Sequence, residues 1–214
     1  MSGTIELKPN QTIVFIGDSI TDTDRNLPAY RPFGFGFVHF TANLLLAKYP
    51  QLNLNIINTG ISGNTVRDLK GRWQKDCIRH KPDILNVLIG INDLWRQYEG
   101  PEQLPQAVYL NEYESTYRQL LSAAVQQYGC QIVLVEPFMF CSDTENEMFI
   151  GLADYIGAVH RLAVEFEAVL VSMQKFIDEQ IEQVPDEKWS LDYVHPYVWA
   201  HAWLARRWFE VTQV

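Results

Sequence analysis

The chain has 214 residues, of which 47% are hydrophobic and 20% are charged, and its formal net charge is −9. This length and composition are typical of one globular domain, which we expect to span residues 1–214 around a single core. The negative charge argues against nucleic acid as a partner, because phosphate-binding proteins carry basic stripes.

The amino-terminal residues show no pattern of a secretory signal or membrane anchor. Residues 1–10 lack a basic stretch followed by a long apolar core, and the apolar run 13–16 is too short to span a bilayer. The three cysteines, Cys77, Cys130 and Cys141, are an odd number without metal-type spacing. We therefore expect a cytoplasmic protein with reduced thiols, no membrane partner, no metal and no cofactor.

The first predicted strand, Thr12–Ile16, leads directly into Gly17-Asp18-Ser19. A short β-branched run is typical of a buried strand, and open α/β folds bind ligands at the carboxyl ends of such strands. Ser19 is a candidate nucleophile, because a helix that begins there would favour negative charge beside its hydroxyl. Taken alone, this serine fits a helix N-cap better.

The next elements bring glycines and an asparagine to the same edge. A helix is predicted over residues 33–49 and a strand over residues 52–57. The segment Asn58–Thr65 follows this strand, and its glycines suit either an oxyanion-binding turn or an ordinary strand-to-helix turn. After a helix over 66–78 and a buried strand over 84–90 comes Asn92. Its amide is a candidate oxyanion donor, or else closes the loop as an Asx turn.

Later segments continue the alternation of helices and strands. The spacing of apolar residues predicts helices over 111–128, 148–167 and 196–211, with Pro196 near the first turn of the last one, and strands over 131–136 and 168–172. Strands that alternate with helices predict a three-layer α/β/α fold with a central, mainly parallel five-stranded sheet.

Asp192 precedes His195 by three residues near the carboxyl end. On a tight turn this spacing lets the carboxylate reach Nδ1 of the imidazole, which fixes the tautomer and leaves Nε2 free as a base. An isolated pair of this kind is more often part of a surface loop. Together with Ser19 after the first strand, however, it supports the hypothesis of a Ser-His-Asp triad.

Absent motifs narrow the reaction class. The chain has no Gly-x-Ser-x-Gly, so it does not present its serine as the nucleophile-elbow hydrolases do. It also lacks the phosphate loop Gly-x-x-x-x-Gly-Lys and the dinucleotide motif Gly-x-Gly-x-x-Gly. Nucleotide chemistry therefore has no support in the sequence.

Four segments together resemble the sequence blocks of the SGNH (GDSL-type) hydrolases. They occur in the family's order and are Gly17-Asp18-Ser19, Gly63 within residues 61–65, Asn92 within residues 90–93, and Asp192 with His195. Residues 60–70, 89–98 and 108–114 are similar to the intracellular acetylxylan esterase branch. The resemblance implies a flavodoxin-like SGNH fold, no cofactor, and a serine esterase that removes O-acetyl groups from carbohydrates such as acetylated xylo-oligosaccharides.

The resemblance also implies a role for each motif residue. Ser19 is the nucleophile, His195 its base and Asp192 the residue that orients the imidazole. The backbone N–H groups of Ser19 and Gly63 and the side-chain amide of Asn92 form the oxyanion hole. The resemblance also implies that a homo-oligomer is possible, and the tryptophans of residues 199–208 are expected to form either a subunit contact or, as the helix pattern favours, a core face.

Aromatic residues flank the motif residues in the sequence and are candidates for sugar binding. They are Trp95 and Tyr98 after Asn92, and Trp189 and Tyr193 around Asp192; Arg96 is a candidate donor to sugar hydroxyls. Tryptophan and tyrosine are more often packing residues with a polar handle.

Two alternatives to the carbohydrate esterase remain open at the level of sequence. The expected ligand is an acetylated oligosaccharide or another small acyl ester, whereas an SGNH thioesterase or lysophospholipase would use the same triad on longer acyl chains. A catalytically silent sugar-binding module would have no need of all five motif residues. Residues 30–37, rich in aromatics and glycine, suit either a lid or an interface.

Overall fold

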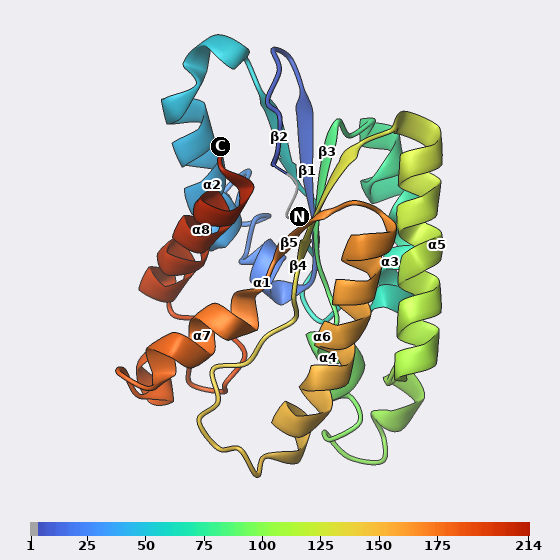
Figure 1. Ribbon diagram of the computed structural model, residues 1–214, viewed down its shortest axis with the longest axis vertical. Coiled ribbons are helices and arrows are strands. Elements are labelled where there is room, and N and C mark those ends of the chain that lie inside the picture. The colour runs from blue at the N-terminus through green and yellow to red at the C-terminus, as the bar shows by residue number, and fades with distance from the viewer. Residues whose placement is uncertain (1–3) are drawn as a thin grey trace.

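The computed structural model describes residues 4–214 and consists of three layers (Figure 1). The central sheet has the strand order β2-β1-β3-β4-β5, and every neighbouring pair is parallel. Its strands are β1 (Thr12–Gly17), β2 (Asn55–Asn58), β3 (Ile84–Leu88), β4 (Gln131–Val135) and β5 (Val169–Val171). The predicted α/β/α fold with a five-stranded sheet is confirmed, and the sheet is parallel throughout.

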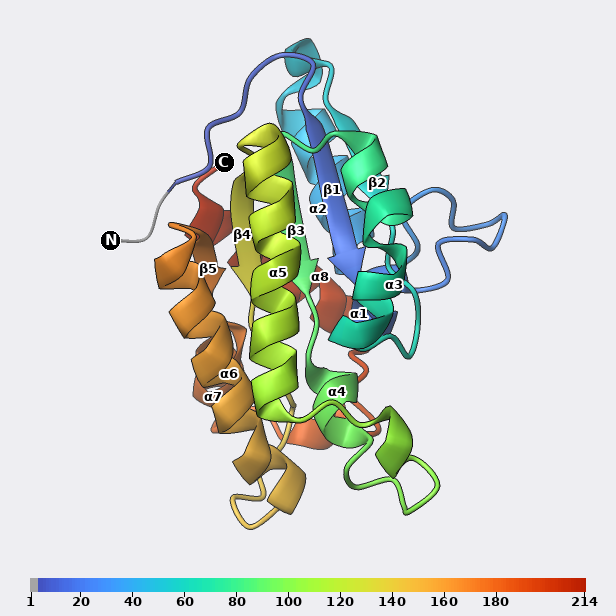
Figure 2. The ribbon, with the colours of Figure 1, turned by 90° about the vertical axis from the view of Figure 1, so that its right-hand side faces the viewer.

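Helices cover both faces of the sheet, as Figures 1 and 2 show. One face carries α2 (Phe37–Lys48), α7 (Met173–Ile181) and α8 (Val198–Thr212); the other carries α3 (Val66–Asp76), α5 (Leu110–Tyr128) and α6 (Glu147–Glu165). Short helices α1 (Ser19–Asp22) and α4 (Ile91–Trp95) follow β1 and β3 at the carboxyl edge. Single 3₁₀ turns are η1 (Pro50–Leu52), η2 (Ile78–His80), η3 (Leu104–Gln106) and η4 (Asp186–Lys188).

The core lies between the sheet and its helices, because both faces of the sheet are covered. All five residues of β3 are buried. The polar side chain of Asn86 in this strand is satisfied by the indole N–H of Trp208, which donates to its Oδ1 over 2.8 Å. Trp208 is 1% exposed, so this part of the tryptophan-rich carboxyl end belongs to the core, whereas Trp199 is 48% exposed.

Several predicted boundaries are wrong for local reasons. The helix predicted over 33–49 begins at Phe37, because Gly34 adopts a φ of 80° and Gly36 is the N-cap. The strand predicted over 52–57 begins only at Asn55, after η1. The last helix begins at Val198, so Pro196 lies before its N-cap, and α7 is missing from the predicted elements.

Two further observations concern the cysteines and the apolar character of the helices. Cys77, Cys130 and Cys141 are buried and form no disulfide. Within residues 4–214, no helix has the length and apolar character needed to cross a membrane.

Candidate active site

The turn that follows β1 presents Ser19. Asp18 is the N-cap of α1, since its Oδ1 accepts a hydrogen bond from the backbone N–H of Ile20 over 3.0 Å. The capping alternative for Ser19 is therefore wrong, and the serine is the first residue of the helix. Gly17 is required before it, because a Cβ at this position would lie 2.2 Å from the Leu88 carbonyl oxygen of β3.

Ser19, His195 and Asp192 form one chain of hydrogen bonds. Oγ of Ser19 lies 2.9 Å from Nε2 of His195, and Nδ1 of His195 lies 2.6 Å from Oδ2 of Asp192. The other carboxylate oxygen of Asp192 accepts bonds from the Ser190 hydroxyl (3.0 Å) and from the backbone N–H groups of Val194 (3.0 Å) and His195 (2.8 Å). These bonds hold the aspartate and the imidazole in one tight turn, which leaves Nε2 facing the serine.

The contacts also set the charge of the pair. Partial burial acts to raise the pKa of Asp192, but hydrogen bonds from His195 and Val194 hold that pKa well below its usual range. The hydrogen bond with Asp192 raises the pKa of His195, against the lowering effect of burial. The carboxylate therefore stays negative and stabilises an imidazolium when His195 takes up a proton.

Two of the predicted oxyanion residues, Gly63 in the turn before α3 and Asn92 at the start of α4, lie on adjoining segments. Gly63, in the turn between β2 and α3, has a φ of 78°, which favours glycine. Nδ2 of Asn92 donates to the backbone carbonyl of Asn64 over 3.0 Å, which places the start of α4 against this turn and leaves its second amide hydrogen available. The guanidinium of Arg96 lies 3.5 Å from the point where a Cβ of Gly63 would be, and it pairs with Glu99.

Arg72 is a positioning residue that the sequence analysis missed. From α3 it donates to the carbonyl oxygens of Thr59 (2.6 Å) and Gly17 (2.9 Å) and to Oδ1 of Asn64 (2.7 Å). These bonds join the ends of β1 and β2 to the turn that carries the predicted oxyanion glycine. The available local signal was its spacing four residues before Asp76, a pairing that usually marks a solvated helix face.

The sequence analysis also assigned no role to two acids that the structure buries, Asp18 and Asp93. Asp18 and Asp93 are 0% exposed, and Oδ1 of Asp93 accepts the N–H of Val66 at the start of α3 over 2.9 Å. Burial raises the pKa of Asp18 to about 7 and that of Asp93 to about 8. Each acid adjoins a motif residue, Ser19 or Asn92, and holds a helix start near the site, because Asp18 accepts the N–H of Ile20 in α1 and Asp93 accepts the N–H of Val66 in α3. Their proximity to the motifs was the signal available in the sequence.

The predicted sugar-binding aromatics divide into two groups. Trp95, Tyr98 and Tyr193 line a cavity of about 310 Å³ beside Asp192, and the Trp95 ring centroid lies 5.9 Å from that of His195. Trp189 is only 3% exposed; it stacks on a buried phenylalanine ring and donates from Nε1 to a backbone carbonyl. This burial contradicts the predicted sugar contact, so Trp189 is a packing residue.

A second, smaller cavity of about 190 Å³ contains Ser19, the candidate nucleophile. It is lined by Ser19, Ile20, Asp22, Thr23, Asp24, Phe35, Ser62, His195, Pro196 and His201. At this cavity Ser19 and His195 meet both polar side chains, such as Asp22, Asp24 and Ser62, and apolar ones, such as Ile20, Phe35 and Pro196.

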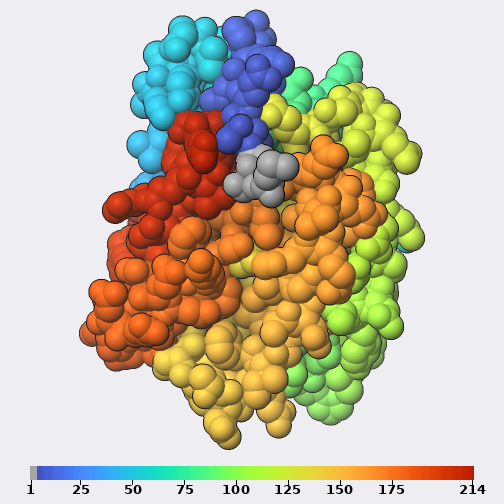
Figure 3. All heavy atoms as spheres, viewed as in Figure 1, coloured from blue at the N-terminus to red at the C-terminus, as the bar shows by residue number. Residues whose placement is uncertain are grey.

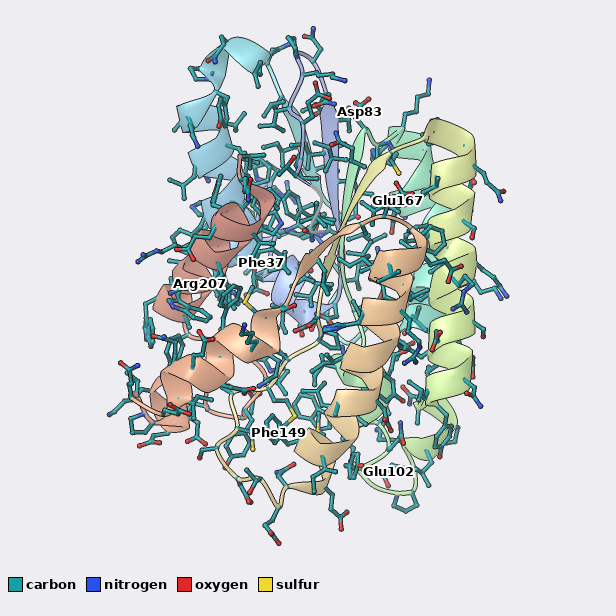
Figure 4. The ribbon with its side chains drawn as sticks, in the orientation of Figure 1. Phe37, Asp83, Glu102, Phe149, Glu167 and Arg207 are labelled. Atoms are coloured by element: carbon teal, nitrogen blue, oxygen red, sulfur yellow. The ribbon has the colours of Figure 1, made fainter. Side chains whose placement is uncertain are left out.

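A larger cavity of about 750 Å³ lies away from these residues, between α6 and α7. Figure 3 shows the face of the molecule on which these two helices lie, and Figure 4 labels Phe149, one of its lining residues, near the start of α6. Glu136 at the end of β4 is 2% exposed there and pairs with His160. The three triad candidates do not line this cavity, so its size does not make it the reaction site.

No group of three or more His, Cys, Asp or Glu side chains is placed to hold a metal ion within residues 4–214. The absence of a cofactor from the reaction stays a prediction.

Comparisons with known proteins agree on the family. The model of the GDSL-like lipase/acylhydrolase family matches residues 15–203. An acetylxylan esterase of Geobacillus stearothermophilus is 38% identical over 206 residues, which are 94% of each chain. The crystal structure of Axe2, an acetylxylan esterase from Geobacillus stearothermophilus, superposes with a TM-score of 0.92 at 36% identity, covering 98% of this chain and 97% of that one.

A second solved structure extends the comparison. LAE5, an alpha/beta hydrolase enzyme from the metagenome of Lake Arreo in Spain, superposes with a TM-score of 0.90 at 31% identity, with 97% of both chains covered. Solved structures of Axe2 also include catalytic mutants in which a serine, an aspartate or a histidine is replaced by alanine. This chain belongs to the GDSL-like lipase/acylhydrolase family, and it is a carboxylic ester hydrolase.

Proposed function

We propose that the protein removes O-acetyl groups from acetylated xylo-oligosaccharides through a Ser19-His195-Asp192 triad. The observation that carries this proposal is the hydrogen-bond chain from Ser19 Oγ through His195 to Asp192, at 2.9 and 2.6 Å. Catalytic mutants of Axe2 affect the same three residue types, and its aspartate and histidine are also three positions apart. The acetylxylan esterase named among the relatives supports the substrate class.

The reaction follows from the positions of the protons. His195 Nε2 accepts the proton of Ser19 as Oγ attacks the acetyl carbonyl carbon, and Asp192 stabilises the resulting imidazolium. The bond between that carbon and the sugar oxygen then breaks, and the imidazolium gives its proton to the sugar. Water attacks the acetyl-serine with His195 again as base, which releases acetate and restores Ser19.

Negative charge develops on the acetyl oxygen during both attacks. We assign its stabilisation to the backbone N–H groups of Ser19 and Gly63 and to the side-chain amide of Asn92. The bond between Asn92 and the Asn64 carbonyl supports this assignment, because it holds the amide against the turn of Gly63 before substrate binds.

The lining of the nucleophile cavity favours a short acyl group over a long one. Its volume is about 190 Å³, and Asp22, Asp24, Thr23 and Ser62 contribute polar groups to its wall. Asp24 has no side-chain partner among residues 4–214, so a long alkyl chain would have to displace water from its carboxylate without satisfying it, which costs free energy. This argues against the alternative of a thioesterase or lysophospholipase.

The test compares acetate release from acetylated xylo-oligosaccharides with hydrolysis of aryl esters of increasing acyl length, for wild type and Ser19→Ala. We expect release from the sugar, a steep fall in rate beyond acetyl, and loss of both activities in the variant. Faster turnover of longer acyl chains would assign the protein to lipid or thioester hydrolysis instead. Sugar hydrolysis that survives in Ser19→Ala would refute the triad.

Cytoplasmic location and homo-oligomeric assembly are further parts of the proposal. The exposed Trp199 at the start of α8 supports a subunit contact at this end of the chain. Light scattering coupled to size-exclusion chromatography tests the assembly, and a monomer at all concentrations would refute it.

A further inference from the structure

Two carboxylates line the cavity that contains Ser19 and His195, and they differ in what they bind. Asp22 is engaged by the protein: its Oδ2 accepts the backbone N–H of Ser62 over 3.0 Å, and its Oδ1 lies 3.7 Å from Nε of Arg25. Asp24, in contrast, is exposed and has no hydrogen bond or ion pair through its carboxylate to any of residues 4–214. Its acceptor capacity is therefore available to a ligand.

Asp24 is held in place although its side chain is free. Thr23 before it is buried and accepts bonds from the backbone N–H groups of Gly36 at Oγ1 (3.0 Å) and Phe35 at its carbonyl (3.1 Å). Arg25 after it donates from Nε to the Gly60 carbonyl over 2.6 Å. The backbone that carries Asp24 is thus fixed at the base of the segment between α1 and α2, which extends away from the sheet in Figure 2.

The backbone at this point is strained. Thr23 and Asp24 are consecutive non-glycine residues with φ values of 39° and 57°. Such conformations persist where the surrounding structure holds them, and they cluster at sites where a group has to be aimed at a ligand. Here they end α1, whose C-cap is Thr23, and turn the chain so that Asp24 lines the cavity.

The rest of the cavity suits a sugar ring. Phe35 is half-buried and packs edge-on against Tyr30 and His201, so part of its ring is open to the cavity. His201 is 2% exposed, and its Nδ1 lacks a hydrogen-bond partner among residues 4–214. Burial lowers the pKa of His201 to about 3, so this part of the wall is neutral.

We propose that Asp24 is a specificity-determining residue. Its carboxylate accepts hydrogen bonds from free hydroxyl groups of the acetylated sugar while the acetyl ester of that sugar lies at Ser19. This inference rests on the proposed function and deepens it, because it explains how the site distinguishes a sugar acetate from a simple acetate ester. Hydrogen bonds to a charged acceptor are among the stronger polar contacts, and a substrate without hydroxyls does not form them.

The test measures the ratio of kcat/KM on acetylated xylo-oligosaccharides to kcat/KM on phenyl acetate. Asp24→Gly removes the carboxylate, and Asp24→Asn removes its charge; glycine and asparagine both tolerate the positive φ at this position. The matched control is Asp154→Asn, an exposed aspartate on α6 that does not line the cavity. We expect the ratio to fall about 10-fold or more in Asp24→Gly, less in Asp24→Asn, and to stay at the wild-type value in the control.

The outcomes separate this inference from the proposed function. A wild-type ratio in both Asp24 variants, or an equal loss on both substrates, would overturn the specificity role while the esterase proposal stands. Wild-type enzyme that hydrolyses phenyl acetate but releases no acetate from the oligosaccharides would overturn the proposed function, and the inference with it.

Discussion

The contact between His195 and Asp192 sets the pH at which the imidazole of His195 loses its proton, and we expect this pH to control activity. In the proposed mechanism the imidazole must be neutral to accept the proton of Ser19, and the hydrogen bond with Asp192 raises the pKa of His195 above its ordinary value of 6.5. We therefore expect activity above the raised pKa and a loss of activity as the pH falls through it.

We predict that the acidic limb of kcat/KM for phenyl acetate lies above pH 6.5 in wild type. In Asp192→Asn the limb should move to lower pH, because the raising contact is gone, and kcat should fall by roughly 10³–10⁴ because the tautomer is wrong. The check is a pH–rate profile from about pH 5 to about pH 9, with Asp154→Asn as the control. An acidic limb that keeps its position in Asp192→Asn would refute this explanation.

At the scale of elements, the close approach of β1 to β3 determines where the site can form. Gly17 is paired with Leu88, and a Cβ on Gly17 would lie 2.2 Å from a backbone oxygen that cannot move without shifting the strand. Its carbonyl also accepts the hydrogen bond from Arg72 that joins β1 to α3.

Gly17→Ala should therefore lower the free energy of unfolding by about 1–3 kcal/mol or more, the usual cost of overpacking, and reduce turnover. Gly71→Ala is the matched change, since a Cβ in that helical position meets nothing within 4 Å. It should raise the free energy of unfolding by about 0.5–1 kcal/mol. Urea unfolding followed by circular dichroism measures both, and equal effects of the two substitutions would contradict the steric argument.

For the whole molecule, buried acids couple stability to pH. Burial raises the pKa of Asp18 to about 7 and of Asp93 to about 8, above the ordinary value of 3.8. Between pH 3.8 and the raised pKa of each acid, the unfolded chain loses a proton that the folded chain keeps. The contribution of each acid to stability is therefore lost as the pH rises through this range. His201, with its pKa lowered to about 3, acts in the opposite direction, because its unfolded form gains a proton below about pH 6.5.

Asp93→Asn imitates the protonated acid and keeps an acceptor for the Val66 N–H. We predict that its free energy of unfolding, relative to wild type, increases by a few kcal/mol between about pH 4 and about pH 8. Urea unfolding at the two pH values measures this difference. A difference that does not change with pH would show that Asp93 is ionised in the folded protein.

The sequence by itself determined the layers of the fold and the motif residues. Buried strands such as 84–88 are continuous apolar runs, and their alternation with helical patterns specifies a parallel sheet, because this information is local. Ser19, Asn92 and His195 stood out for the same reason, each in a short motif beside a strand or turn.

Tertiary structure decided which other residues belong to the site. Ser19 and His195 are 176 residues apart, and the bond between them depends on how α1 and the carboxyl-terminal turn pack at one sheet edge. The sequence position of Trp189 beside the Asp192 motif predicts a sugar-binding residue, but other aromatics cover its side chain. The spacing of Arg72 and Asp76 predicts a solvated helix face, but Arg72 bridges the ends of two strands. The burial and partners of a side chain depend on the elements that pack over it, which neighbouring residues in the sequence do not specify.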